Sequence, residues 1–198
     1  CLKFQARFDF EVDELARAAL IECKEEITKS AQARVLEELL RMLESGSSFA
    51  FLKLMTEHGL LDELLPSLAS ILKNEEGNAI YRYLEKGDLL ISESRPYLIK
   101  RPVFIACLTF PLLEAYLKTH FLDQEKIPHL GEIYNASHLM IDKVFTSFHL
   151  PKKLRISTVN TLVSQYRITP IDPKKKITFR VPRTCLLYTS DADDDSLR

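Results

Sequence analysis

Apolar residues recur at helical spacing from the start of this 198-residue chain. Leu2, Phe4 and Phe8 fall at helical spacing, which predicts a short opening helix. After a turn, Asp13 is a typical N-cap residue for a helix over 14–27. The apolar stripe expected on the inner side of that helix consists of Leu15, Ala16, Ala18, Ala19 and Ile27.

The clearest amphipathic pattern lies over 31–43, where apolar residues repeat every three or four positions. Ser30 is expected to cap this helix, and Ser45 with Gly46 is expected to end it. Its inward side chains are expected to be Val35, Leu36, Leu39, Leu40 and Leu43.

The rest of the chain keeps the same period, so the sequence predicts an all-α fold. The polar stretch KNEEGN is expected to be a loop, and KITFRV has only a weak strand pattern. Because the helices do not repeat at a fixed length, an irregular helical array is expected rather than a solenoid. The further helices are expected over 49–59 after a cap at Ser48, 60–72 with a break at Pro66, 79–86, 102–120 with a kink at Pro111, 127–148 and 152–168.

Charge is segregated along the chain, although the formal total is only −1 at pH 7. Residues 1–150 hold 17 Lys and Arg against 23 Asp and Glu, whereas 151–183 hold 9 against 1. Residues 184–198 hold 1 against 4. A basic block on an acidic body favours a polyanionic partner, and a solvated basic helix face is the alternative interpretation.

Neither the cysteines nor the histidines form a metal or disulfide motif. Cys1, Cys23, Cys107 and Cys185 lie far apart without a C-x-x-C pair, which is typical of reduced thiols, so a cytoplasmic location is expected. The five histidines show no H-x-x-x-H spacing, and no metal is predicted. The apolar run PVFIACLTFPLLEAYL falls short of the ~20 residues of a membrane span, so no membrane partner is expected.

The sequence also lacks a recognisable catalytic motif. It has no Gly-rich phosphate loop, no Ser/His/Asp set in a plausible order and no close pair of aspartates on a strand. Phosphoryl transfer by metal ions needs carboxylates that hold Mg²⁺ against phosphates. Acidic helical stretches such as ECKEE are more typical of a solvent-exposed surface, so the chain by itself is expected to have no catalytic centre.

Three stretches taken in order resemble the bacterial poly(A) polymerases, which share the second class of nucleotidyltransferases with the CCA-adding tRNA enzymes. CLKFQARFDFEVDELARAAL resembles the back half of the neck motif of that class, in which an E-D-x-x-R stretch runs into a helix. AQARVLEELLRMLESG resembles the following R-x-x-E-E helix, and AFLKLMTEHGLLDELLP resembles the leucine-rich helices after it. RPVFIACLTFPLLEAYL and LPKKLRISTVNTLVSQYRI are similar to the later body of the poly(A) polymerase branch.

The resemblance implies a neck over 1–60 and a helical body over 61–183. In this family a head domain supplies the metal-binding carboxylates, and the E-D-x-x-R stretch reads the incoming base. By the matched register both precede Cys1, so this chain is expected to be an inactive fragment without the catalytic head. The implied parent is an adenylyltransferase that uses ATP and Mg²⁺ to add AMP to RNA 3′ ends, with no DNA partner expected.

The resemblance also implies roles for a few residues near the start of the chain. Arg34 and Glu38 match the R-x-x-E-E helix and are expected to fix the nucleotide-binding neck; an ordinary i, i+4 ion pair is the alternative. Lys3 matches a basic position that could approach a triphosphate or the head domain, and a free surface lysine is the alternative. Asp9 stands where the family commonly has glycine, but Asp tolerates the left-handed conformation that a tight helix end requires.

Phosphate contacts are expected from the basic block, because extension of any RNA end favours backbone contacts over base readout. Tyr166 is a candidate stacking residue, with packing into the core as the alternative. The cations expected to bind RNA are Lys152, Lys153, Arg155, Lys174, Lys175, Lys176 and Arg180, with Arg183 close by.

The segment 184–198 breaks this pattern, since TCLLYTSDADDD is similar to the translation of a sequencing adaptor. It is expected to be a non-native tail, with a genuine acidic tail as the alternative. Two other functions stay open: a fragment of a CCA-adding tRNA nucleotidyltransferase, and an all-α protein-interaction module without an RNA role.

Overall fold

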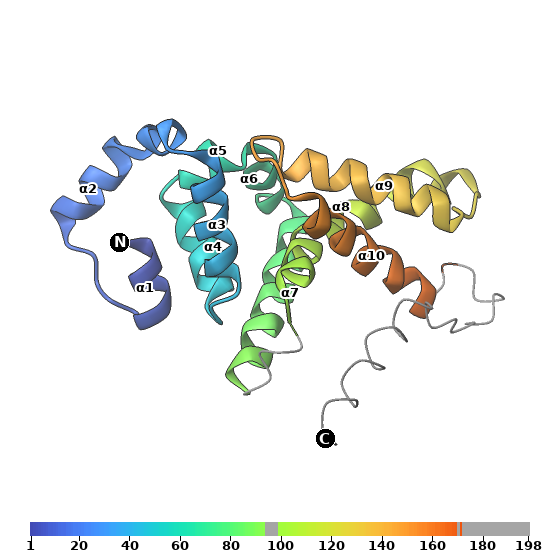
Figure 1. Ribbon diagram of the computed structural model, residues 1–198, viewed down its shortest axis with the longest axis horizontal. Coiled ribbons are helices and arrows are strands. Elements are labelled where there is room, and N and C mark those ends of the chain that lie inside the picture. Colours follow the sequence, from blue (N-terminus) through green and yellow to red (C-terminus); the bar gives the residue numbers. More distant parts are fainter. Residues whose placement is uncertain (94–98, 170, 172–198) are drawn as a thin grey trace, which may run out of the picture.

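The computed structural model describes residues 1–93, 99–169 and 171, and this part of the chain is all-α without any strand, as the sequence predicts. Figure 1 shows an irregular array in which the helices point in several directions. The elements are α1 (Leu2–Phe8), α2 (Glu14–Glu22), η1 (Lys24–Lys29), α3 (Gln32–Leu43), α4 (Ser48–Glu57), α5 (Leu60–Leu64), α6 (Pro66–Leu72), α7 (Glu75–Ser92), α8 (Arg101–His120), η3 (Leu122–Gln124), α9 (Leu130–Val144) and α10 (Lys152–Ile168).

The first two helices follow the local signals in the sequence. Asp9 ends α1 in the left-handed conformation, with φ 53° and ψ 36°, so the expected tolerance of Asp at this turn is confirmed. The Asp13 carboxylate accepts hydrogen bonds from the backbone N–H groups of Leu15 at 3.1 Å and Ala16 at 3.3 Å, which confirms the N-cap of α2. The helix ends at Glu22, however, and the chain continues as the 3₁₀ segment η1 rather than as helix to residue 27.

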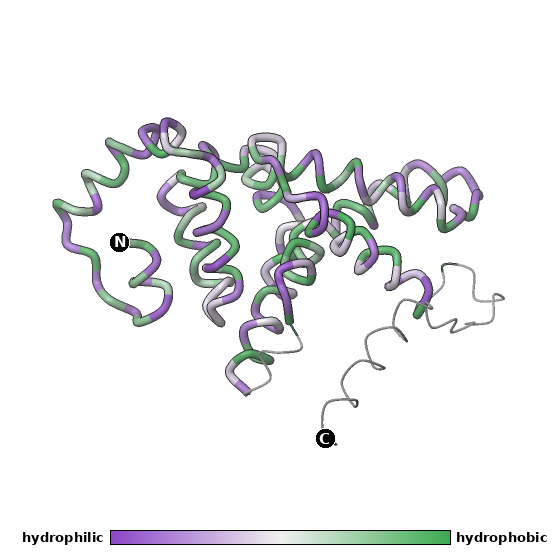
Figure 2. Tube along the Cα trace, viewed as in Figure 1, coloured by the Kyte–Doolittle hydropathy of each residue, from purple (hydrophilic) through white to green (hydrophobic). Residues whose placement is uncertain are grey.

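The expected inner stripe is wrong for α2, because no residue of this helix is buried and Leu15 is 80% exposed; Ile27 of the stripe lies in η1 and packs half-buried against the core. Figure 1 shows α2 lying at one end of the array, away from the central helices. Figure 2 shows hydrophobic positions recurring along α1 and α2. The exposed apolar side chains of this end are Phe4, Phe8, Phe10, Leu15 and Ile21. An exposed apolar patch is typical of an interaction surface.

Two of the expected caps are wrong by one residue. Ala31, not Ser30, precedes α3, and Ser30 directly follows η1. Ser48 is the first residue of α4 rather than its cap, and its hydroxyl donates at 2.8 Å to Asp88, a residue of α7. Of the five side chains expected to point inward from α3, four are buried, and Val35 is only half-buried.

The helix α7 is much longer than the predicted helix over 79–86. It begins inside KNEEGN, so the expected loop there is wrong. Gly77 permits this start, since a Cβ at this position would lie 2.5 Å from the Cα of Leu72. The interior of α7 is fixed by Ile80 and Leu84, which are fully buried against neighbouring helices. Tertiary packing of an apolar stripe therefore extends a helix whose first turn is polar.

The remaining boundaries agree more closely with the sequence. Pro66 opens α6 at its first position, so the expected break is confirmed, and α8 runs from Arg101 to His120 through Pro111. The helix expected over 127–148 is shorter in the structure, where α9 covers Leu130–Val144. The segment KITFRV lies outside the described residues.

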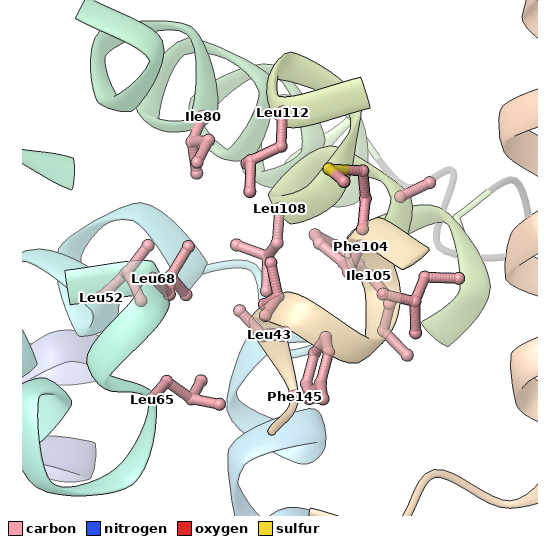
Figure 3. Packing of buried hydrophobic residues seen from close by; sticks show 14 of the residues in the cluster. Leu43, Leu52, Leu65, Leu68, Ile80, Phe104, Ile105, Leu108, Leu112 and Phe145 are labelled. Carbon is pink, nitrogen blue, oxygen red and sulfur yellow. The ribbon is translucent and has the colours of Figure 1, made fainter. Parts of the chain in front are cut away.

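The hydrophobic core is one continuous cluster of buried side chains that extends from Leu2 to Val163. Its centre is α8, which packs against α3, α7, α9 and α10. Figure 3 shows Leu43 of α3, Phe104 and Leu108 of α8, and Phe145, which directly follows α9, gathered in one part of the core. Because nine residues of α8 are buried, other elements enclose much of this helix, and it organises the array.

The segment Arg101–Gln124, which contains α8, also has the length and apolar character of a membrane span, with mean hydropathy 1.2 over its best window. It is longer than the apolar run considered in the sequence. Half of that window is buried inside the described fold, where α8 forms the core.

Candidate RNA-binding region

Two of the three residues expected at the neck, Lys3 and Glu38, lie together in the structure. The Lys3 ammonium in α1 donates to the Glu38 carboxylate in α3 at 3.1 Å, across 35 positions of sequence. This hydrogen bond and the positive charge of Lys3 lower the pKa of Glu38. Both side chains are about half exposed, so the pair lies on the surface. Lys3 is thus an ion-pair partner that ties α1 to α3 rather than a free lysine.

Arg34 lies on the exposed side of α3. The alternative of an i, i+4 ion pair between Arg34 and Glu38 is wrong within the described residues, because Glu38 pairs with Lys3 and with Arg41 instead. The Arg34 guanidinium therefore faces solvent from the helix that carries the R-x-x-E-E motif.

The other glutamate of this motif, Glu37, joins α3 to the start of α8. Arg101 donates two hydrogen bonds to Glu37, at 2.7 and 2.8 Å, and a third to Glu44 at 2.8 Å. These bonds lower the pKa of Glu37 and raise the pKa of Arg101. The fork geometry of a guanidinium suits two carboxylates at once. This contact could not be predicted from local sequence patterns, since Arg101 lies 64 positions from Glu37.

The basic cluster expected at the start of α10 divides into two groups. Lys152 and Lys153 occupy the first turn and are exposed. Cations at this end oppose the helix dipole, which weakens the helix slightly but concentrates positive potential for an anion. Arg155 is only half-buried and binds the carboxylate of Asp142 and the ring of His138. The Arg155 guanidinium therefore contacts two side chains of α9, and only part of the residue is exposed to solvent.

His138 is held as a hydrogen-bond acceptor in this contact. The Arg155 Nε–H donates to His138 Nδ1 at 3.1 Å, which requires an unprotonated Nδ1. Burial lowers the pKa of His138, and the nearby positive charge of Arg155 lowers it further, while Asp142 opposes the shift. The contact between α9 and α10 is thus linked to a neutral imidazole.

Tyr166 packs against the core in the described fold. The alternative interpretation of this residue is therefore confirmed, and its expected role in stacking on RNA is wrong. Its hydroxyl oxygen is buried without a hydrogen-bond partner among the described residues, and its ring packs against Phe110 at a centroid distance of 6.0 Å. Burial raises the pKa of Tyr166. The remaining expected RNA-binding residues, Lys174, Lys175, Lys176 and Arg180, lie outside the described residues, as do Arg183 and the tail 184–198.

A groove of about 580 Å³ between α4 and α7 was not expected from the sequence. Each helix contributes one stripe at helical spacing, which would have been a signal only if the pairing of these two helices had been known. The lining residues are Phe49, Lys53, Thr56 and Glu57 from α4, and Asn78, Tyr81, Arg82 and Glu85 from α7. No group of three or more His, Cys, Asp or Glu side chains in the described part of the chain is placed to hold a metal ion.

A comparison with protein families relates part of this region to a known protein. Residues 9–72 match the family described as "Probable RNA and SrmB- binding site of polymerase A". The match begins at the end of α1, includes α2 to α6, and covers about a third of the chain. No curated protein matches the chain. The matched segment therefore resembles the RNA-binding region of polymerase A. This agrees with the resemblance to poly(A) polymerases that the sequence motifs indicated.

Proposed function

We propose that this chain is the RNA-binding neck and body of a polynucleotide adenylyltransferase, an enzyme that adds AMP from ATP to RNA 3′ ends. The observation that carries the proposal is the match of residues 9–72 to an RNA-binding site of polymerase A. Because that description names polymerase A, it favours a poly(A) polymerase parent over a CCA-adding enzyme. The ion pairs of Lys3 with Glu38 and of Arg101 with Glu37 support the neck role, since they join α3 to α1 and α8.

ATP and Mg²⁺ belong to the proposed complete enzyme. The described residues include no acidic cluster that fits a metal ion, so no step of nucleotidyl transfer is assigned to them. Their proposed task is to hold single-stranded RNA by its phosphates, and the exposed Lys152 and Lys153 at the start of α10 fit that task. The basic residues 174–176 extend the same charge along the chain.

Salt dependence of RNA binding tests this proposal directly. If roughly four cations contact phosphates, the logarithm of the affinity should fall with the logarithm of salt at a slope of about −3, since each contact on single strands contributes ~0.7. Binding of a fluorescein-labelled oligo(A) of twenty nucleotides to the full chain can be followed by fluorescence anisotropy. Replacement of Lys152 and Lys153 by glutamine should flatten the slope by about 0.7, since one of the four contacts is left for this pair when residues 174–176 supply three.

Replacement of Lys174, Lys175 and Lys176 by glutamine should flatten the slope by about two. Lys73→Gln serves as the control, because Lys73 lies far from the basic block in sequence and pairs with Asp62 at 3.3 Å. The helical content should be unchanged in every variant. An affinity that ignores salt and both sets of replacements, or no binding at low salt, would contradict the proposal and favour the interaction-module interpretation.

A further inference from the structure

We infer that the groove between α4 and α7 binds one nucleotide, with its base against Phe49 and Tyr81 and its phosphate near Lys53 and Arg82. The nucleotide can be free or part of an RNA strand, because both present the same base and phosphate. The inference rests on the proposed RNA-binding function, which makes a nucleotide the relevant ligand. The groove adds a base-binding site to the phosphate contacts expected at the basic block.

The groove is built by antiparallel packing of two helices. The Asp88 carboxylate, near the end of α7, accepts hydrogen bonds from the backbone N–H groups of Ser48 and Phe49 at the start of α4, both at 2.9 Å. Farther along, the Thr56 hydroxyl in α4 lies 3.4 Å from the Tyr81 hydroxyl in α7. These two contacts fix both the direction and the spacing of the helices. The lining side chains are therefore presented by rigid elements, which is what a ligand site requires.

Two aromatic side chains, Phe49 and Tyr81, line the groove. The rings of Phe49 and Tyr81 meet edge to face, with centroids 5.6 Å apart and an interplanar angle of 78°. Both side chains are only half-buried. In an edge-to-face pair each ring keeps part of its flat surface uncovered by the other, and a planar base can stack on such a surface.

Polar groups around the rings match the edges of a base. The Thr56 hydroxyl donates to the Leu52 carbonyl at 2.9 Å, so in the contact with Thr56 the Tyr81 hydroxyl is the donor. The Tyr81 oxygen then keeps lone pairs that can accept an N–H group. Glu85 is exposed on the same stripe and can accept from an exocyclic amino group, as carboxylates do with cytosine. These acceptors favour a base that carries an amino group, such as adenine or cytosine.

The cations of the groove have capacity for a phosphate. Arg82 is exposed and has no ion pair within the described residues, and Lys53 has only a distant partner, Glu57, at 3.9 Å. The two cations and two carboxylates balance, so the groove should not attract polyanions by net charge alone. Recognition must then come from the base and one phosphate together, which is the behaviour expected of a nucleotide site.

The test uses AMP and two RNA strands of twelve nucleotides, one of adenosine and one with abasic residues, with the full chain. Backbone amide signals of α4 and α7 should shift in NMR spectra on addition of AMP or of the adenosine strand. Phe49→Leu should weaken binding of the adenosine strand by ~10-fold or more, because each stacked base contributes substantially to affinity. The same variant should leave the weaker binding of the abasic strand unchanged.

Two further variants separate a specific effect from a folding defect. Arg82→Gln changes an exposed side chain and should weaken AMP binding and flatten the RNA salt slope by about 0.7. Tyr134→Leu removes an aromatic ring that is 38% exposed on α9, and it should change neither. The melting temperature of each variant reports whether the fold is intact.

The outcomes distinguish the two proposals. Salt-dependent RNA binding that is unaffected by Phe49→Leu and Arg82→Gln would overturn the groove site and leave the proposed function in place. Shifts in the groove with AMP, without any RNA binding, would support the site for a free nucleotide and overturn the proposed function. Absence of both would overturn both proposals.

Discussion

Replacement of Asp88 by alanine should destabilise the fold by removing the cap of a helix 40 positions away in sequence. Ser47 is the N-cap residue of α4, but its side chain accepts no hydrogen bond from the backbone of the first turn. The Asp88 carboxylate takes this role, accepting from two backbone N–H groups at 2.9 Å and from the Ser48 hydroxyl at 2.8 Å. Its negative charge also faces the positive end of the α4 dipole.

The expected cost follows from the groups left without a partner. Ser48 is completely buried, whereas Asp88 is half-buried, so water can reach only part of the site. Loss of an N-cap costs ~0.5–2 kcal/mol, and each buried donor without an acceptor costs ~1–3 kcal/mol. With partial hydration, Asp88→Ala should cost about 3 kcal/mol. In a chain of this size, that corresponds to a melting temperature lowered by ~6–12 °C.

Thermal unfolding followed by circular dichroism measures this shift, and two variants calibrate it. Ser48→Ala removes only the hydroxyl and should cost about 1 kcal/mol, or ~2–4 °C. Asp62→Asn changes an exposed acid that pairs with Lys73 and should leave the melting temperature almost unchanged. If Asp88→Ala lowers the melting temperature by less than about 2 °C, or no more than Asp62→Asn does, the capping argument is refuted.

Two further predictions concern other tertiary contacts. Gly77→Ala should destabilise the chain by ~1–3 kcal/mol, because the new Cβ would lie 2.5 Å from the Cα of Leu72. Gly131→Ala should be neutral or stabilise by up to ~1 kcal/mol, because a Cβ at Gly131 would meet no neighbouring residue within 4 Å. Urea unfolding of both variants checks this, and equal effects would contradict it. NMR titration should give a folded-state pKa of His138 below the ordinary value of 6.5, and Arg155→Met should raise it; a pKa at or above 6.5 in the parent chain would contradict the contact. Because the folded state disfavours the proton, the contribution of His138 to stability is complete above pH 6.5 and falls as the pH drops through that value and then through the lower folded pKa.

Most helices were predictable from the sequence because their signals are local. The stripe of α3, the break at Pro66 and the cap at Asp13 each depend on residues within a few positions of one another. The left-handed turn at Asp9 is equally local, since it depends on the short side chain of that residue alone. The all-α class followed from the sum of these signals along the chain.

The candidate site was less predictable, because its geometry depends on which helices pack together. The sequence marked Lys3, Glu38 and Arg155 as functional residues, but their partners come from other helices. Lys3 meets Glu38 only because α1 packs beside the helices that follow it. The groove between α4 and α7 had no signal at all, since each stripe alone resembles an ordinary exposed helix face.

Tertiary structure also overruled local preference where long-range contacts were stronger. Ser48 has the chemistry of a cap, but Asp88 of α7 supplies the acceptor and leaves Ser48 inside the helix. Conversely, the apolar stripe of α2 predicted burial, yet no residue of this helix is buried in the described fold. Local propensities are each worth a fraction of a kcal/mol, whereas the burial of Ile80 and Leu84 is worth several times more. The sequence alone determined which segments become helices, and packing between distant segments decided where they end and which of their faces are free to bind.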